Sequence, residues 1–267
     1  MKELDKRGGK LDLGEKLDIG PIGKVPQREE CPICMRVLPV HSMLQTYSEC
    51  CGKTVCGGCE RQHQMKNNGQ ALPHMCAFCR TVAPRSDEED LAQLRKRVEL
   101  KDPDALLNMA MDYGDGGFGL PVDHAKCIEL LREAADLGHP PAQCQLGNFY
   151  RNGGMGLEQN KKEAQKNYEQ AAEGGDLDAR HNLACAEKEA GNEVAAMRHC
   201  RLAASGGYRD AMDGLVSAFE NGLLRHGDLA ETLQAFYRSR DEMKSEGRDQ
   251  YITYLKMKGE YKEEYEC

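Results

Sequence analysis

Residues 102–240 carry a repeating pattern of alanine, apolar, aromatic and glycine positions. The first unit returns after 37 residues, and a later unit returns after 32. The recurring positions are Ala105, Met109, Tyr113 and Gly116 in the first unit and Ala142, Leu146, Tyr150 and Gly153 in the second. Within each unit the apolar positions follow helical spacing. The pattern therefore predicts units of two helices each, stacked into an all-α helical-repeat solenoid.

Glycines, acidic residues and paired alanines mark the ends and contacts of these helices. Glycine pairs favour helix ends because glycine accepts positive φ. Aspartate or asparagine stands where the N-caps of second helices belong, at Asp123, Asn160, Asn192 and Asp228. Close contacts between helices require small residues at equivalent positions of successive units. The alanines at such positions are Ala134, Ala171 and Ala203.

A linker helix is expected just before the repeats. Ser86 and Glu89 form a capping box, which predicts a helix over residues 87–100. Asp102 and Pro103 then suit an N-cap and a first helical position. We expect residues 85–101 to be a semi-rigid linker between the repeats and the segment that precedes them.

That preceding segment is rich in cysteine. Eight of the 13 cysteines fall in four pairs, Cys31 and Cys34, Cys50 and Cys51, Cys56 and Cys59, and Cys76 and Cys79. Three pairs have the C-x-x-C spacing at which two thiolates reach one tetrahedral zinc ion at ~2.3 Å. Because no secretory signal is visible, we expect reduced thiols and metal in place of disulfides. Eight ligands predict two zinc ions.

Charge and hydropathy exclude several classes of partner. The net charge is −8, and residues 102–267 alone carry −11. No segment has the basic stripe that binds phosphates, so nucleic acid is not an expected partner. No apolar stretch approaches the ~18 residues of a membrane span, so no membrane association is expected. These features favour a cytoplasmic location, with the nucleus as a second possibility.

The cysteine pattern over residues 29–84 resembles the RING finger, the zinc module of many ubiquitin ligases. The resemblance implies a small α+β cross-brace domain in which alternate pairs share one ion. The first ion would take Cys31, Cys34, Cys56 and Cys59, and the second Cys50, Cys51, Cys76 and Cys79. Lys53 stands where the common pattern has histidine, which leaves two alternatives. Either Cys50 and Cys51 both bind at a bend assisted by Gly52, or Cys51 binds together with His63 or His74.

The resemblance also implies a function. RING fingers position a ubiquitin-conjugating enzyme and its ubiquitin, and they supply no catalytic residue of their own. The family's enzyme-contacting positions match Ile33 and Phe78, and its basic residue after the last cysteine matches Arg80. Ala77 and His63 depart from the family pattern. The alternative is a non-enzymatic adaptor in which zinc only builds an interaction module.

The repeat pattern resembles Sel-one-like repeats, relatives of the tetratricopeptide repeat, over residues 102–247. This resemblance implies a concave surface that recruits a protein substrate or scaffold. Residues 1–28 are expected to be disordered, and residues 248–267 to form a last helix or a tail. Together these patterns predict a RING-type ubiquitin ligase with helical repeats as its partner-binding arm.

Overall fold

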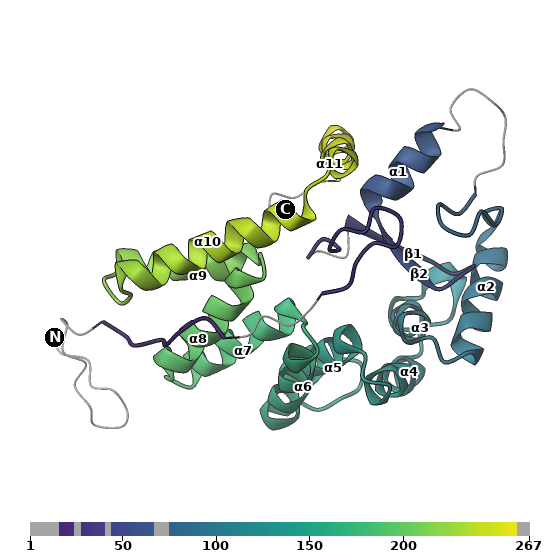
Figure 1. Cartoon of the computed structure of the whole chain (residues 1–267). Coiled ribbons are helices and arrows are strands. Elements are labelled where there is room, and N and C mark those ends of the chain that lie inside the picture. The colour runs from purple at the N-terminus through teal and green to yellow at the C-terminus, as the bar shows by residue number, and fades with distance from the viewer. Residues whose placement is uncertain (1–15, 24–27, 41–43, 67–74, 261–267) are drawn as a thin grey trace. The chain divides into compact units, whose positions relative to one another are not determined.

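The computed structural model describes residues 16–23, 28–40, 44–66 and 75–260 (Figure 1). The chain divides into two compact units. One contains Pro26–Asp176 with Asp241–Cys267, and the other contains Met1–Val25 with Leu177–Arg240. We call them the cysteine-containing unit and the second helical unit, and each is described by itself.

The cysteine-rich segment folds around one hairpin and one helix. Strand β1 (Gln45–Ser48) pairs antiparallel with β2 (Lys53–Cys56), and helix α1 (Gly57–Lys66) follows β2 directly. Gly52 closes the hairpin with a φ of 64°, as a turn at this position requires. One core cluster of this segment contains Cys31, Leu38, Val55 and Cys56. The segment therefore contains a small strand pair followed by a helix.

The expected linker helix forms and is capped as the sequence predicts. Helix α2 (Asp87–Glu99) begins after Ser86, whose hydroxyl accepts a hydrogen bond from the Glu89 backbone N–H at 3.3 Å. Helix α3 (Pro103–Asp115) begins after Asp102, which accepts from the Ala105 N–H. Because these side chains satisfy orphan backbone donors, both helix starts are fixed locally.

The repeats of the cysteine-containing unit continue with α4 (His124–Asp136), α5 (Pro140–Asn152) and α6 (Lys161–Glu173), with a short 3-10 turn at Gly117–Gly119. Helix α3 packs on α4, and α5 packs on α6. The N-caps expected at Asp123 and Asn160 are present, accepting from Lys126 N–H and Glu163 N–H. The alanines in register are fully buried, at Ala105, Ala134, Ala142 and Ala171.

The second helical unit contains α7 (Leu177–Glu189), α8 (Glu193–Ser205), α9 (Arg209–Glu220) and most of α10 (His226–Met243). The repeat register persists here, because Ala179, Ala203 and Ala211 are again fully buried. Even α10, with 18 residues, carries six charged side chains. Among the helices that the structure describes, none is long and apolar enough to cross a bilayer.

Two of the predicted N-caps behave differently in this unit. Asn192 precedes α8, but its side-chain amide donates to Glu187 Oε2 at 2.6 Å and caps no backbone group. Asp228 lies inside the first turn of α10, so the prediction that it is the N-cap is wrong. Its carboxylate instead accepts from Arg201 at 3.2 Å, a tertiary ion pair that replaces the local cap.

Residues 16–23 differ from the expected disorder of residues 1–28. They run without regular secondary structure along the second helical unit, and Leu17 and Ile19 are buried there. The alternation of apolar with polar or glycine positions by itself suggests an unfolded segment. Buried apolar contacts with distant helices, which no local pattern reveals, account for the difference.

The chain's last described element is helix α11 (Glu246–Lys258), which belongs to the cysteine-containing unit and packs on α1. Of the two expectations for residues 248–267, the helix is present up to Lys258. By sequence Gly57 and Gly58 suit positive-φ turns, but both begin α1 with ordinary helical φ. Their lack of a side chain serves packing, because a Cβ on Gly58 would lie 2.6 Å from the Arg248 backbone nitrogen.

Candidate metal centres

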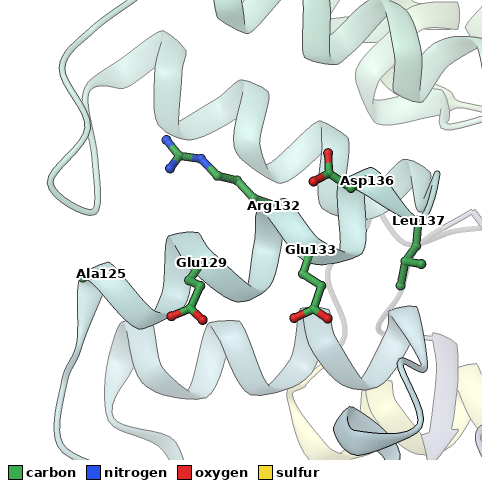
Figure 2. Close-up of a pocket in the computed structure, with 6 residues that line it drawn as sticks. All are labelled: Ala125, Glu129, Arg132, Glu133, Asp136 and Leu137. Atoms are coloured by element: carbon green, nitrogen blue, oxygen red, sulfur yellow. The ribbon is translucent and has the colours of Figure 1, made fainter.

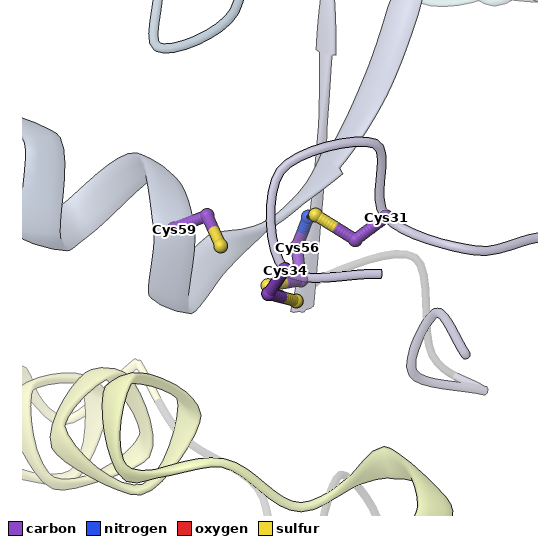
Figure 3. A group of neighbouring side chains, drawn as sticks. All are labelled: Cys31, Cys34, Cys56 and Cys59. Atoms are coloured by element: carbon purple, nitrogen blue, oxygen red, sulfur yellow. Dashed lines mark hydrogen bonds between the residues drawn. The ribbon is translucent and has the colours of Figure 1, made fainter. Parts of the chain in front are cut away.

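The first group of cysteines joins a loop, a strand and a helix. Cys31 and Cys34 lie on the loop before β1, Cys56 ends β2, and Cys59 lies in the first turn of α1 (Figure 3). Their four sulfur atoms lie within 4.8 Å of one another. The Cys34 and Cys56 sulfurs are 3.9 Å apart, and the Cys56 backbone N–H donates to the Cys31 sulfur at 3.4 Å.

The second group contains Cys50, Cys51, Cys76 and Cys79, whose sulfurs also lie within 4.8 Å of one another. The Cys50 and Cys79 sulfurs are 3.3 Å apart, and those of Cys51 and Cys76 are 3.9 Å apart. Both adjacent cysteines point into the group because they lie on the hairpin turn, where the Ser48 carbonyl accepts from the Cys51 N–H at 3.2 Å.

The structure thus brings together the two sets of four that the RING resemblance implies. Of the alternative ligands, His63 is outside the second group and contacts Arg80. His74 lies outside the described residues.

Two loops of the site share one backbone geometry. In the first, the Met35 N–H donates to the Cys31 carbonyl at 2.9 Å; in the other, the Arg80 N–H donates to the Cys76 carbonyl at 3.1 Å. Met35 and Arg80 both adopt positive φ, at 54° and 65°. This tight reversal folds each C-x-x-C back on itself, which lets both sulfurs of a pair reach one point.

The spacing of the sulfurs fits zinc. Four thiolates at ~2.3 Å from a tetrahedrally coordinated ion lie about 3.8 Å from one another. The observed separations of 3.9, 3.3 and 3.9 Å are close to this value. Four sulfur ligands with no open position are the donor set of closed structural zinc sites. The cysteines could therefore hold two ions, one in each group.

Electrostatics also favour a cation at each group. A shared hydrogen bond with Cys56 lowers the pKa of Cys31 to about 4, and raises the pKa of Cys56. Burial and the neighbouring cysteines raise the pKa of Cys59 to about 12 and that of Cys51 to about 11. Without metal, adjacent thiolates repel one another and resist ionisation together. A divalent cation would supply the charge that lets all four sulfurs ionise.

Arg248 of helix α11 lies beside the first group, although no sequence motif points to it. Its side chain is only 4% exposed. It donates to the Val37 carbonyl at 2.7 Å and to the Met243 carbonyl, and its Nη2 lies 3.7 Å from the Cys34 sulfur. A buried guanidinium in this position would offset the negative charge of four thiolates around an ion, much as outer hydrogen-bond partners orient and tune metal ligands.

The residues expected to contact a conjugating enzyme lie at the surface. Ile33 is 40% exposed and Phe78 is 41% exposed, each between the two cysteines of its loop. Arg80 is exposed too, and its guanidinium lies 2.7 Å from Nδ1 of His63. Met35, in the loop of Ile33, is more exposed still. Each loop therefore presents apolar surface, and the second adds a cation.

Polar contacts anchor the hairpin to the linker helix α2 and to the start of α3. The Tyr47 hydroxyl donates to Asp102 Oδ2 at 3.0 Å, and Arg97 Nε donates to the Glu49 carbonyl at 3.3 Å. Burial and the nearby Asp102 carboxylate raise the pKa of Tyr47, which keeps the hydroxyl protonated as a donor. These contacts hold the hairpin against α2 and the start of α3.

Surface hollows lie on the described repeats of this unit. One, of about 440 Å³, lies along α4 between Ala125 and Leu137 (Figure 2). Its Glu133 pairs with Lys101 and its Glu129 with Lys126, so these carboxylates are already compensated. The other, of about 490 Å³, is lined by polar residues of α4, α5 and α6, including Arg132, Gln143, Tyr150 and Lys166.

Comparison with protein families identifies the repeats. Residues 103–139 and 140–176 match the family described as Sel1 repeat. The matched segments correspond to α3 with α4 and α5 with α6. The Sel1-type repeats predicted for this part of the chain are therefore confirmed, and the match does not extend to residues 29–84.

One solved structure shows a similar fold. A protective antigen of uropathogenic Escherichia coli strains, described as displaying an SLR fold, has a TM-score of 0.51 at 19% identity, covering 75% of this chain and 49% of its own. This chain thus spans about half the length of that protein. A Sel1 repeat protein from Oxalobacter formigenes has a TM-score of 0.49 at 22% identity, covering 68% and 72% of the two chains. A search of curated proteins finds no match.

Proposed function

We propose that the chain is a zinc-binding, RING-type ubiquitin ligase whose Sel1 repeats recruit its protein partners. The observation that carries this proposal is the surface made by the two cysteine loops. Ile33 and Phe78 offer apolar contact to a conjugating enzyme, and Arg80 follows the last cysteine with its guanidinium exposed. The planar guanidinium suits a group that must donate to enzyme and ubiquitin at once.

The repeats support the second half of the proposal. Helical repeats stack into extended surfaces that commonly bind other proteins. The polar hollow between α4, α5 and α6 offers donors and acceptors of both charges on such a surface. Tyr47 and Arg97 fix the hairpin to the start of α3 and to the linker helix α2. This attachment would give a recruited partner a defined position relative to the zinc sites.

The second candidate function is a non-enzymatic adaptor, and a specific observation favours it. His63 occupies the position where the family often has a large apolar residue, and it is already engaged with Arg80. In an adaptor the two zinc ions would only stabilise an interaction module, and Arg80 would be dispensable.

Ubiquitin discharge from a panel of conjugating enzymes distinguishes the two functions. Arg80→Ala removes no cysteine and changes an exposed side chain, so we expect the fold and zinc content to be retained. Discharge should slow by about an order of magnitude, because the guanidinium no longer positions the ubiquitin-loaded enzyme. A tenfold slower rate corresponds to ~1.4 kcal/mol in activation free energy. Arg85→Ala, another exposed arginine, is the matched control and should discharge at the normal rate.

Two results would contradict the ligase. An unmodified protein that discharges no enzyme in the panel supports the adaptor, provided that it contains two zinc ions. An active protein whose rate is unchanged by Arg80→Ala retains ligase activity but refutes the positioning role of the Arg80 guanidinium.

Docking is tested separately at Ile33. Ile33→Ala shortens an exposed apolar side chain, so it should weaken binding of the conjugating enzyme whether or not ubiquitin is attached. Arg80→Ala should weaken only the ubiquitin-loaded form. Titration calorimetry with free and ubiquitin-linked enzyme measures both affinities. Equal losses for the two variants in both forms would contradict the separate roles.

A further inference from the structure

An extended segment of the chain lies on the second helical unit. Residues 16–23 form no helix or strand. The Leu17 backbone N–H donates to the Leu223 carbonyl, in the turn between α9 and α10, at 2.8 Å. Leu17 is buried, and Ile19 is only 2% exposed. Alternate side chains therefore face the helices, as they do in a bound extended peptide.

The helices hold a buried cation against the backbone of this segment. Arg201 of α8 is only 1% exposed, and its Nη1 donates to the Gly20 carbonyl. Two carboxylates of α10 fix the guanidinium, Asp228 at 3.2 Å and Glu231 at 2.8 Å. Arg201 binds the main-chain carbonyl of Gly20, whose φ of 65° favours glycine at this position. The buried positions of Leu17 and Ile19 select side chains.

The segment does not fill the surface on which it lies. A hollow of about 240 Å³ remains between residues 19–23 and α8, bordered by Arg198, Arg201 and Leu202. Two buried side chains and a few hydrogen bonds stabilise the bound segment. They must offset the conformational entropy that is lost when the whole segment becomes ordered. The affinity of the site for the segment as a separate peptide is therefore expected to be weak. In the intact chain the segment still occupies the site, because covalent attachment gives it a high effective concentration.

We propose that this surface of α8, α10 and the Leu223 turn is a recognition site for extended peptides of the pattern Leu-x-Ile-Gly-Pro. Residues 17–21 carry that pattern and occupy the site in cis. A partner protein that displays the same pattern binds by displacing them. The proposal deepens the partner-recruiting role of the repeats, and it requires neither zinc nor ubiquitin transfer.

Fluorescence anisotropy with a labelled peptide of residues 15–24 tests the proposal. In the full chain, Leu17→Ser with Ile19→Ser should vacate the site, so that this variant binds the peptide at least tenfold more tightly than the unmodified chain. Lys16→Ser, a change at an exposed neighbouring position, should leave the site occupied. A peptide carrying the same two serines should bind none of the three proteins.

Circular dichroism shows whether the double variant keeps its helices. A folded variant that fails to bind the peptide, or an unmodified chain that binds it equally well, overturns the proposal. If the variant does not fold, a protease site placed at residues 25–26 of the otherwise unmodified chain allows cleavage after folding. We expect the released fragment to separate on gel filtration and to exchange with labelled peptide; a fragment that stays bound and does not exchange overturns the proposal.

Neither assay contains ubiquitin or a conjugating enzyme. Peptide binding without ubiquitin discharge would refute the ligase and leave the recognition site standing. Ubiquitin discharge without peptide binding would support the ligase and refute the recognition site.

Discussion

At the scale of single residues, alanine sets the geometry of the repeats. The second-helix alanines Ala134, Ala171 and Ala203 are completely buried although they lie in successive units. A methyl side chain lets two helix backbones approach closely, and the dense interior leaves no room for more atoms. These positions therefore determine helix spacing, whereas the long apolar residues fill the space between the contacts.

Enlarging one of these alanines should destabilise the repeats. Ala171→Leu forces α6 away from its neighbours, and we expect a loss of ~1–3 kcal/mol in the free energy of unfolding. Glu173→Leu, at an exposed position of the same helix, should change that free energy by less than about 0.5 kcal/mol. Urea denaturation monitored by circular dichroism compares the two. Equal effects would contradict the register of the repeats.

The recurrence of these alanines is also why the repeats could be predicted from the sequence. Each unit restates the same local pattern, and caps such as Asp123 and Asn160 satisfy their own helix starts. Asp228 shows the limit of this reasoning, because a partner on another helix, Arg201, competes successfully for its carboxylate. A local pattern cannot report such a tertiary contact.

At the scale of elements, the pairing of α1 with α11 was the main feature that the sequence did not predict. The cysteine spacing predicts the C-x-x-C pairs, and the RING resemblance implies which pairs share one group. Gly57 and Gly58 also stood out, but a glycine pair is compatible with a tight turn as well as with close packing. Only the position of α11 against them decides between these explanations.

Arg248 makes this pairing relevant to metal binding. Arg248→Ala removes a buried cation near Cys34 and leaves the Val37 carbonyl without its donor. Loss of an outer partner commonly lowers metal affinity about 10- to 100-fold, and we expect this range for one of the two zinc ions. Gln250→Ala, at an exposed position of α11, should leave both affinities unchanged. Competition with a colorimetric chelator measures them, and identical curves for the two variants would contradict the role of Arg248.

At the scale of the whole molecule, we expect metal binding and apolar packing to stabilise different parts of the chain. The cysteine-rich segment has a small core cluster of Cys31, Leu38, Val55 and Cys56, so we expect its fold to depend largely on bound zinc. Structural zinc contributes ~10–16 kcal/mol in small zinc peptides. Every helix from α3 to α10 buries apolar side chains, so we expect the repeats to fold without an ion.

Chelation should therefore unfold one part of the chain selectively. Native mass spectrometry of the purified protein should show two zinc ions. After chelation, hydrogen exchange should accelerate over residues 44–66 and 75–82, while the exchange of α4–α6 changes little. One ion or none in the intact protein would contradict the two-site assignment, and uniform acceleration would contradict the division of stability.

The contact between α11 and α1 can form only late in the synthesis of the chain. Arg248 and Val37 are 211 residues apart. At about 5–20 residues per second, a ribosome would need roughly ten seconds or more to reach Arg248 after completing α1. Throughout that interval the nascent cysteine-rich segment could bind zinc but would lack its helical cover. Newly made chains would thus display the Gly57–Gly58 face to chaperones, and a premature stop codon before α11 would leave that face permanently open.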